Sequence, residues 1–458
     1  MRLAFLLLLA AVRPAPLPLA APTLVHATLV SSEPAANSRL SASPSRIRLV
    51  YSEPVEGDLA RVTLVPRTGA SIKLRAAGDP RDVNAVIAQV DSLVAGGYRV
   101  EWRVVSADGH PVDGTYTFAV GDTTLGMPSA VATDTMAQHE DPADSVPASD
   151  APMEDDVWGP SLYAAPLIPA LFRGAGLGSL MALAGMLFFR VRCGPNATQV
   201  GCPRVNRALT TAALGAALLL VGHTLTWLVN TSPEHTLDMA WMSSALGTTV
   251  GKIEIWRTGV AVLALWAWWI ARRPALALLF AAASLAISGA TGHSAAMSPV
   301  AMIPAKAIHL LASAVWVGGL AWLIIRPRSD SVEQFAGDAT RVSTGALIAV
   351  IAVAFTGVVQ TVTFLPSLGD VLTSPYGWIA LAKTAGLLVL VAFGAYHRQR
   401  VMPRIAAARD AKDGAVLRAS VRREVVVMAL VILLGGLLAY VPPPEGGDMS
   451  TSTHEPTS

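Results

Sequence analysis

Long apolar segments dominate the second two-thirds of this chain of 458 residues. They are rich in Ala, Leu, Val, Ile, Gly and Trp, and each is about long enough to cross a bilayer. We place eight of them at residues 162–189, 208–229, 255–271, 274–291, 305–325, 345–364, 376–397 and 425–441. A water-soluble domain does not contain eight such runs, so we predict an all-α polytopic membrane bundle of eight transmembrane helices.

The overall composition agrees with a membrane protein that carries a water-soluble appendage. Hydrophobic residues make up 53% of the chain and charged residues only 14%. The formal net charge of +2 is too small to indicate nucleic-acid binding, so we expect the lipid bilayer and no nucleic acid as a partner.

Basic residues gather in every second loop between the predicted spans. The loop between spans seven and eight holds the largest group: Arg398, Arg400, Arg404, Arg409, Lys412, Arg418, Arg422 and Arg423. The intervening loops, 230–251, 292–305 and 366–375, contain no Lys or Arg. Because basic loops stay in the cytoplasm, we predict that both termini lie on the periplasmic or extracellular side of the inner (cytoplasmic) membrane.

The first part of the chain predicts an exported β domain. Residues 1–25 read as a signal peptide, since a basic start precedes an apolar run. Residues 26–121 contain seven short strand-like runs separated by Gly, Pro, Asp and Ser, which predicts an all-β sandwich or small barrel. The strand-like runs are 27–31, 46–51, 61–66, 71–75, 85–90, 98–105 and 115–120. An acidic linker (122–158), the membrane domain (159–441) and a polar tail (442–458) follow.

The β domain contains one candidate metal site. Asp108 and His110 are two residues apart, so in an extended backbone their side chains project to the same side. Carboxylate and imidazole together suit Cu(II). If processing leaves His26 as the first residue, its amine and ring nitrogen add two more ligands. On its own an Asp-Gly-His sequence is also common in turns.

A second candidate site lies at the outer side of the predicted bundle. His223 falls in the outer third of span two, His293 follows the outer end of span four, and His309 lies about one turn inside span five. Met297 and Met302 are in or near the loop between the last two. Imidazole and thioether groups suit copper in either oxidation state. The alternative for each histidine is a hydrogen bond to a neighbouring helix.

Arg173 and Lys383 lie inside predicted spans, and they indicate a polar interior without defining a role. His397 ends span seven beside the basic loop, where we expect an interfacial residue more than a metal ligand.

Three stretches of the β domain resemble the CopC copper-binding proteins. They are HATLVSSEPA at 26–35, YSEPVE at 51–56 and YRVEWRVVSADGHPVDG at 98–114. The resemblance implies a cupredoxin-like β-sandwich in which His26, Asp108 and His110 hold Cu(II). The residues before His26 depart from the family, because they are not the expected small pair.

Motifs of the membrane half resemble the CopD family of inner-membrane proteins. They are GHS at 292–294, HLLASAVWVGGL at 309–320, YGWIALAK at 376–383 and YHR at 396–398. A CopC domain followed by a CopD domain implies capture of copper outside the membrane and transfer across it, in copper uptake, homeostasis or resistance. This reading makes the protein a carrier and not an enzyme, with periplasmic copper chaperones as candidate partners. A haem- or copper-dependent redox protein and a non-transporting chaperone or sensor are the alternatives.

Overall fold

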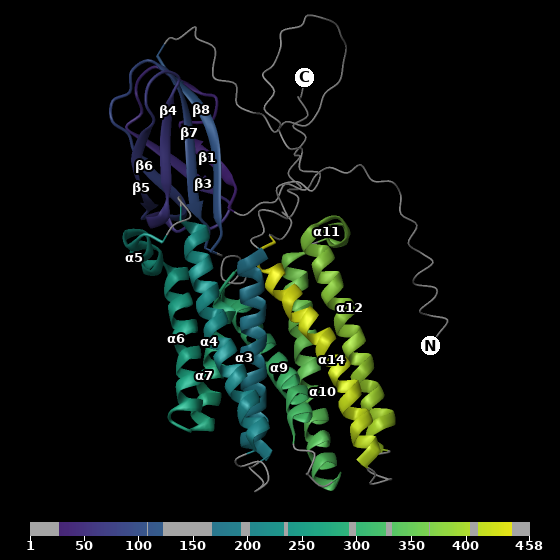
Figure 1. Ribbon diagram of the computed structural model, residues 1–458. Helices are drawn as coiled ribbons and strands as arrows, with labels where there is room; N and C mark the ends of the chain where they lie inside the picture. Colours follow the sequence, from purple (N-terminus) through teal and green to yellow (C-terminus); the bar gives the residue numbers. More distant parts are fainter. Residues whose placement is uncertain are drawn as a thin grey trace, which may run out of the picture.

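The computed structural model describes residues 27–107, 109–121, 167–193, 202–232, 237–292, 299–326, 332–365, 367–403 and 411–441. The predicted signal peptide, the acidic linker and the polar tail lie outside these ranges. The described residues form a β domain that stands over one end of a helical bundle (Figure 1).

The β domain is a single sheet of eight strands in the order β1-β3-β6-β5-β4-β7-β8-β2. The strands are β1 (Leu29–Glu33), β2 (Arg39–Leu40), β3 (Arg46–Tyr51), β4 (Arg61–Pro66), β5 (Ile72–Asp79), β6 (Asp82–Gln89), β7 (Gly96–Val105) and β8 (Pro111–Val120). The seven predicted strands are all present. Strand β2 was not predicted, because its two residues are too few to show an alternating pattern; it pairs in parallel with β8.

Strand β5 joins two halves of the sheet. Its first residues pair with β4 and its last residues pair with β6, so the sheet folds over and its halves face each other as an open barrel. Alternate residues of β3 are buried in the core between them, as its alternating sequence requires. Tyr51 from one half meets Trp102 from the other edge-on, with ring centroids 5.2 Å apart. Gly114, paired with Trp102, leaves room for the indole, because a Cβ there would lie 2.5 Å from Trp102 Cζ2.

All eight predicted spans are helical in the structure. The helices are α3 (Leu167–Cys193), α4 (Pro203–Thr231), α6 (Thr249–Trp269), α7 (Pro274–Ile287), α9 (Pro299–Ile325), α10 (Val332–Phe364), α12 (Pro375–Tyr396) and α14 (Ala411–Leu438). Two short helices were not predicted, α5 (Met239–Gly247) and α11 (Leu368–Thr373). Short one-turn segments are η1 (Gly57–Leu59), η2 (Ser288–Ala290) and η3 (His397–Val401).

Five of the described helices, α3, α4, α9, α10 and α12, are long and apolar enough to cross a membrane. The apolar helix formed by α7 and η2 is shorter, Pro274–Ala290. Helix α6 carries Lys252, Glu254 and Arg257, whereas α14 carries Arg422, Arg423 and Glu424. The structure is therefore that of a multi-pass membrane protein with five membrane-length helices, and the count of eight remains a prediction.

Helix α3 lies at the centre of the bundle and packs against α4, α9 and α14. The backbones of α3 and α9 approach closely at Gly185 and Gly318, where a Cβ on Gly185 would lie 1.9 Å from Ala314 O. Helix α10 packs on α9 and α12 packs on α14, but α10 and α12 scarcely touch. The bundle is therefore tight around α3 and more open between α10 and α12.

Candidate functional site

The loop between β7 and β8 holds the part of the predicted copper site that the structure describes. It is a tight turn in which Ser106 N donates to His110 O at 2.9 Å and Gly109 N donates to Ser106 O at 2.8 Å. Gly109 has a φ of +95°, which favours glycine. His110 is only 7% exposed, so this turn presents a buried imidazole.

Glu53 ties this turn to the beginning of the domain. Its Oε1 accepts hydrogen bonds from Ala27 N at 3.0 Å and from Ser106 Oγ at 2.6 Å. Ala27 directly follows His26 in the chain. The other two predicted ligands, His26 and Asp108, lie outside the described residues, so the structure does not test the three-residue copper site.

The same turn rests on the membrane domain. Trp227 Nε1, from α4, donates to Gly109 O at 2.9 Å. A Cβ on Gly109 would lie 3.1 Å from Val250 Cγ1 and 3.3 Å from Trp227 Nε1, so the contact is close. Residues of both domains form one apolar cluster: Leu59, Val105, Trp227, Leu228, Trp241, Ala245 and Val250. The β domain is therefore docked on α4, α5 and α6 (Figure 1).

Polar contacts strengthen the docked arrangement. Glu56 Oε1 accepts from Thr249 N at 3.1 Å and from Val250 N at 3.3 Å, at the start of α6. A carboxylate at a helix N-terminus is favourable. Burial nevertheless raises the pKa of Glu56 above its ordinary value, and the two backbone N–H groups only partly offset this effect. Arg103 Nη2 also donates to Asn230 O at 3.2 Å.

A chain of ring contacts leads from the β domain into the bundle. The ring of His110 meets that of Tyr440 edge-on, with centroids 4.8 Å apart. Tyr440 follows α14, and its hydroxyl lies 2.8 Å from His223 Nε2. His223, on α4, is buried. One tyrosine therefore bridges a predicted ligand of the β domain and a predicted ligand of the membrane domain.

Two charged residues of α6 contact Nδ1 of His223, the ring nitrogen that faces away from Tyr440. Arg257 Nη2 lies 2.7 Å from His223 Nδ1, and Glu254 Oε2 lies 3.2 Å from the same atom. Arg257 also pairs with Glu254. The guanidinium of Arg257 can only donate and the carboxylate of Glu254 can only accept, so the two compete for Nδ1 of His223, while the Tyr440 hydroxyl occupies Nε2. Any metal, including a haem iron, would have to displace one of these partners to reach a ring nitrogen.

More cations lie beside this network. Arg173 Nη2 donates to Thr291 Oγ1 at 2.8 Å, and Lys306 Nζ donates to the carbonyl oxygen of Thr291. Arg173 interacts electrostatically with His223 and Glu254. The position of Arg173 inside a predicted span indicated a polar bundle interior, and the buried contact of Arg173 with Thr291 confirms this prediction. Its described charges are mainly positive, which disfavours a bare metal cation there.

Of the remaining predicted ligands of the membrane domain, the two that the structure describes, His309 and Met302, have different surroundings. His309 Nδ1 pairs with Thr356 Oγ1 at 2.9 Å. Met302 packs in an apolar cluster with Phe364 and Tyr376. His293 and Met297 lie outside the described residues. Within the described ranges no three His, Cys, Asp or Glu side chains are grouped to hold a metal, so this set stays a prediction.

Sequence reasoning missed Tyr440, Trp227 and the pair Glu254 and Arg257. Arg257 could have been found, because a charge inside an apolar run usually has a role. Tyr440 and Trp227 gave no signal, since aromatic residues are common near the ends of membrane helices.

Three family models match successive parts of the chain. The CopC domain model matches residues 29–121, the copper resistance protein D-like N-terminal domain model matches 164–303, and the copper resistance protein D model matches 336–438. The boundaries fall close to those of the β domain and of the two halves of the bundle.

Individual proteins agree with the family models. The chain is 26% identical over 401 residues to the copper transport protein CutJ of Bacillus subtilis, covering 81% of this chain and 67% of CutJ. It is 40% identical over 97 residues to protein YobA of Escherichia coli K12, covering 21% of this chain and 78% of YobA. With copper resistance protein C of Escherichia coli it shares 38% identity over 107 residues, 21% of this chain and 82% of that protein.

Solved structures match the β domain. CopC from Methylosinus trichosporium OB3b is 30% identical, with 22% of this chain and 100% of CopC covered and a TM-score of 0.20. PcoC, a methionine-rich copper resistance protein from Escherichia coli, is 35% identical, with coverages of 21% and 99% and a TM-score of 0.19. The chain belongs to the CopC and CopD copper-resistance family, and it joins both kinds of domain in one polypeptide.

Proposed function

We propose that the β domain captures copper outside the cytoplasmic membrane and passes it to the membrane domain, which moves it across. In this proposal His26, Asp108 and His110 hold Cu(II). The copper then reaches the outer end of the bundle, where His223, His293, His309, Met297 and Met302 are the candidate ligands. CutJ, a relative over most of the chain, is named a copper transport protein, which supports this assignment.

The observation that carries the proposal is the contact from His110 through Tyr440 to His223. The His110 and Tyr440 rings are 4.8 Å apart, and the Tyr440 hydroxyl is 2.8 Å from His223 Nε2. A metal leaving the β-domain site at His110 would therefore enter the bundle beside His223 without crossing bulk water. The tether of residues 122–158 would keep the two domains at a high effective concentration even when they separate.

Tyr440 is the gate in this scheme. While its hydroxyl occupies His223 Nε2, the imidazole has no free nitrogen for copper, because Arg257 occupies Nδ1. A shift of Tyr440 would free Nε2 and open a path at the same time. The cations Arg173, Arg257 and Lys306 would then repel a metal that stayed unliganded, which favours direct exchange between ligands over free diffusion.

The membrane arrangement follows from the same reading. Helices α6, α7 and α14 run in the bundle beside the five membrane-length helices, which supports eight crossings. The basic loops then face the cytoplasm, and the β domain and both termini face the other side of the inner membrane.

The test is the copper content of cells grown in copper-containing medium. Strains lacking the protein are compared with strains producing the intact chain, His110→Ala, His309→Ala or the control Tyr396→Phe, whose exposed ring lies at the opposite end of the bundle. We expect the intact chain and the control to change cell-associated copper equally and both alanine variants to blunt the change. Equal copper in all strains would favour a non-transporting chaperone or sensor and contradict the proposal.

A further inference from the structure

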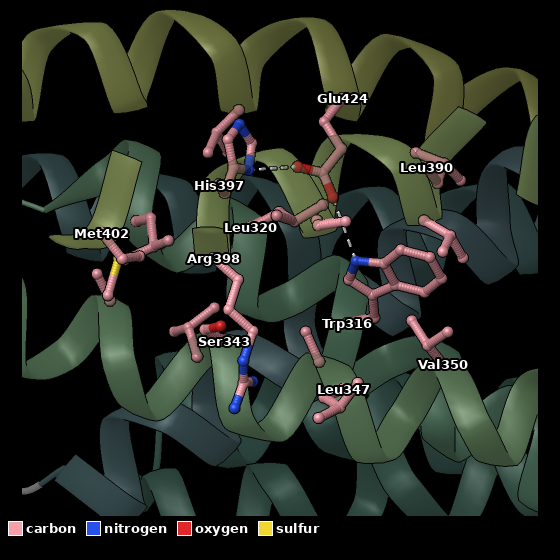
Figure 2. A pocket seen from close by; sticks show the side chains of 18 of the residues that line it. Trp316, Leu320, Ser343, Leu347, Val350, Leu390, His397, Arg398, Met402 and Glu424 are labelled. Carbon is pink, nitrogen blue, oxygen red and sulfur yellow. Dashed lines mark hydrogen bonds and ion pairs between the residues drawn. The ribbon is translucent and has the colours of Figure 1, made fainter. Parts of the chain in front are cut away.

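A cavity lies at the end of the bundle away from the β domain. It has a volume of about 280 Å³ and is lined by residues of α9, α10, α12, η3 and α14. Most of its walls are apolar, with Leu320, Val350 and Leu390 among them (Figure 2). Apolar pockets between helices that contain a few converging polar groups are typical ligand sites. No part of the proposed copper path uses this cavity.

One wall of the cavity is polar and deeply buried. His397 Nδ1 lies 3.3 Å from Glu424 Oε2, and Trp316 Nε1 donates to Glu424 Oε1 at 3.3 Å (Figure 2). His397 Nε2 pairs with Ser420 Oγ at 2.7 Å. Glu424 is 1% exposed, and its Oε2 accepts no proper hydrogen bond from the described residues. This carboxylate therefore has capacity for a further donor.

The cavity opens sideways towards lipid. Leu347 on α10 and Val391 on α12 both line it, yet they are 45% and 39% exposed on the outer surface of the bundle. Helices α10 and α12 hardly touch each other, so this is the side on which the cavity is least covered by helix packing. A molecule dissolved in the bilayer can enter there without passing through water.

The polar groups select the chemistry of the occupant. Glu424 would repel the phosphate of a lipid headgroup, and a bare acyl chain would leave the spare oxygen of the carboxylate without a donor. Arg398 also lines the cavity and can donate to a carbonyl oxygen (Figure 2). A neutral ring with oxygen atoms that accept from Arg398, and that donate to Glu424 when they carry hydrogen, matches the polar groups of this wall that can still form hydrogen bonds. From this geometry we infer a binding site for a lipid-soluble quinone or quinol between α10 and α12.

The test uses the full-length protein purified in detergent and titrated calorimetrically with decylubiquinone. Decylbenzene, which has the same tail and no oxygen, is the comparison ligand. We expect saturable binding of the quinone only. Ala346→Phe fills the cavity, and Glu424→Gln removes the negative charge and replaces one acceptor oxygen with an NH2 donor; each should weaken binding about tenfold. Ile348→Phe, on the lipid-facing side of the same helix, is the matched control and should bind normally.

Three results would overturn the inference. They are the absence of saturable quinone binding by the intact chain, equal binding of decylbenzene, and quinone affinity that neither variant changes. If Ala346→Phe fails to fold, its thermal unfolding shows this, and Glu424→Gln then decides. Because copper takes no part in the titration, its outcome is independent of the proposed copper transfer.

Discussion

The two ends of the bundle both combine a histidine with a glutamate, but they surround them differently. At the end that faces the β domain, His223 and Glu254 lie among arginines and beneath a docked domain. At the end away from the β domain, His397 and Glu424 form one wall of an apolar cavity. The pair His223 and Glu254 is therefore part of a charged network. The pair His397 and Glu424 keeps a carboxylate oxygen that can accept a further hydrogen bond.

This difference indicates how each end can work. The network around His223 extends into the β domain, since Tyr440 contacts both His110 and His223. Separation of the two domains would therefore remove one of its contacts. The pair His397 and Glu424 involves only the helices that line the cavity, so a small molecule bound there could affect it directly.

The largest expected effect is the difference in stability lost when Glu254 and Glu424 are each replaced by glutamine. Glu254→Gln leaves Arg257 buried without its counter-charge, and we expect a loss of stability of about 3–5 kcal/mol. Glu424→Gln should cost only about 1–2 kcal/mol, because it contacts the imidazole of His397 and the indole of Trp316 where Glu254 contacts a buried guanidinium. Thermal and denaturant unfolding of the purified variants measures both. Equal losses would show that the two environments do not differ as described.

Next in size is the effect of Gly109→Ala on docking. The added methyl group meets Val250 and Trp227, and the residue must keep a positive φ, so we expect docking to weaken by about 1–3 kcal/mol. Gly69→Ala is the matched control, since Gly69 has a φ of +115° but its nearest neighbour is Pro66 Cγ at 3.8 Å. Energy transfer between dyes on the two domains should fall for Gly109→Ala alone. A similar fall in the control would assign the effect to the β domain itself.

A smaller change in stability is expected for Tyr440→Phe. The ring still packs on His110, while the hydroxyl that reaches His223 is lost, which should cost about 0.5–1.5 kcal/mol. Copper movement should change far more than stability if the hydroxyl gates His223. Unchanged copper movement in reconstituted vesicles would remove Tyr440 from the path.

The smallest effect is the pH dependence of docking through Glu56. Burial at the interface raises the pKa of docked Glu56, so the docked state binds more protons than the separated state. Docking should be strongest below the ordinary pKa of a glutamate and weaken as pH rises through the pKa of the docked residue. Energy transfer measured between pH 4 and pH 8 tests this, and Glu56→Gln should flatten the profile. A profile that rises with pH in the intact chain would contradict the assignment.

Much of the fold could be predicted because each element has a local signal. The alternation of 46–51 predicted β3, and long apolar runs predicted the eight helices. Strand β2 and helices α5 and α11 were missed, because their few residues carry no period. Membrane crossing is harder to predict for α6 and α14, whose charged residues can be buried among other helices instead of facing lipid.

Less of the site could be predicted, because its contacts join distant parts of the chain. The sequence indicated His110 and His223 separately, but nothing local shows that Tyr440 lies between them. The contact of Gly109 with Trp227 depends on how two domains dock. The cavity away from the β domain likewise arises from four helices, and His397 alone gave no reason to expect it.

The most direct test of the account is copper flux in vesicles that contain the full-length protein. Uptake of radioactive copper is compared for the intact chain, Gly109→Ala and Gly69→Ala, with energy transfer recording the docked fraction of each. Transfer through the docked interface predicts that flux falls with docking in Gly109→Ala and stays normal in Gly69→Ala. Normal copper flux through a Gly109→Ala protein whose domains have separated would contradict it.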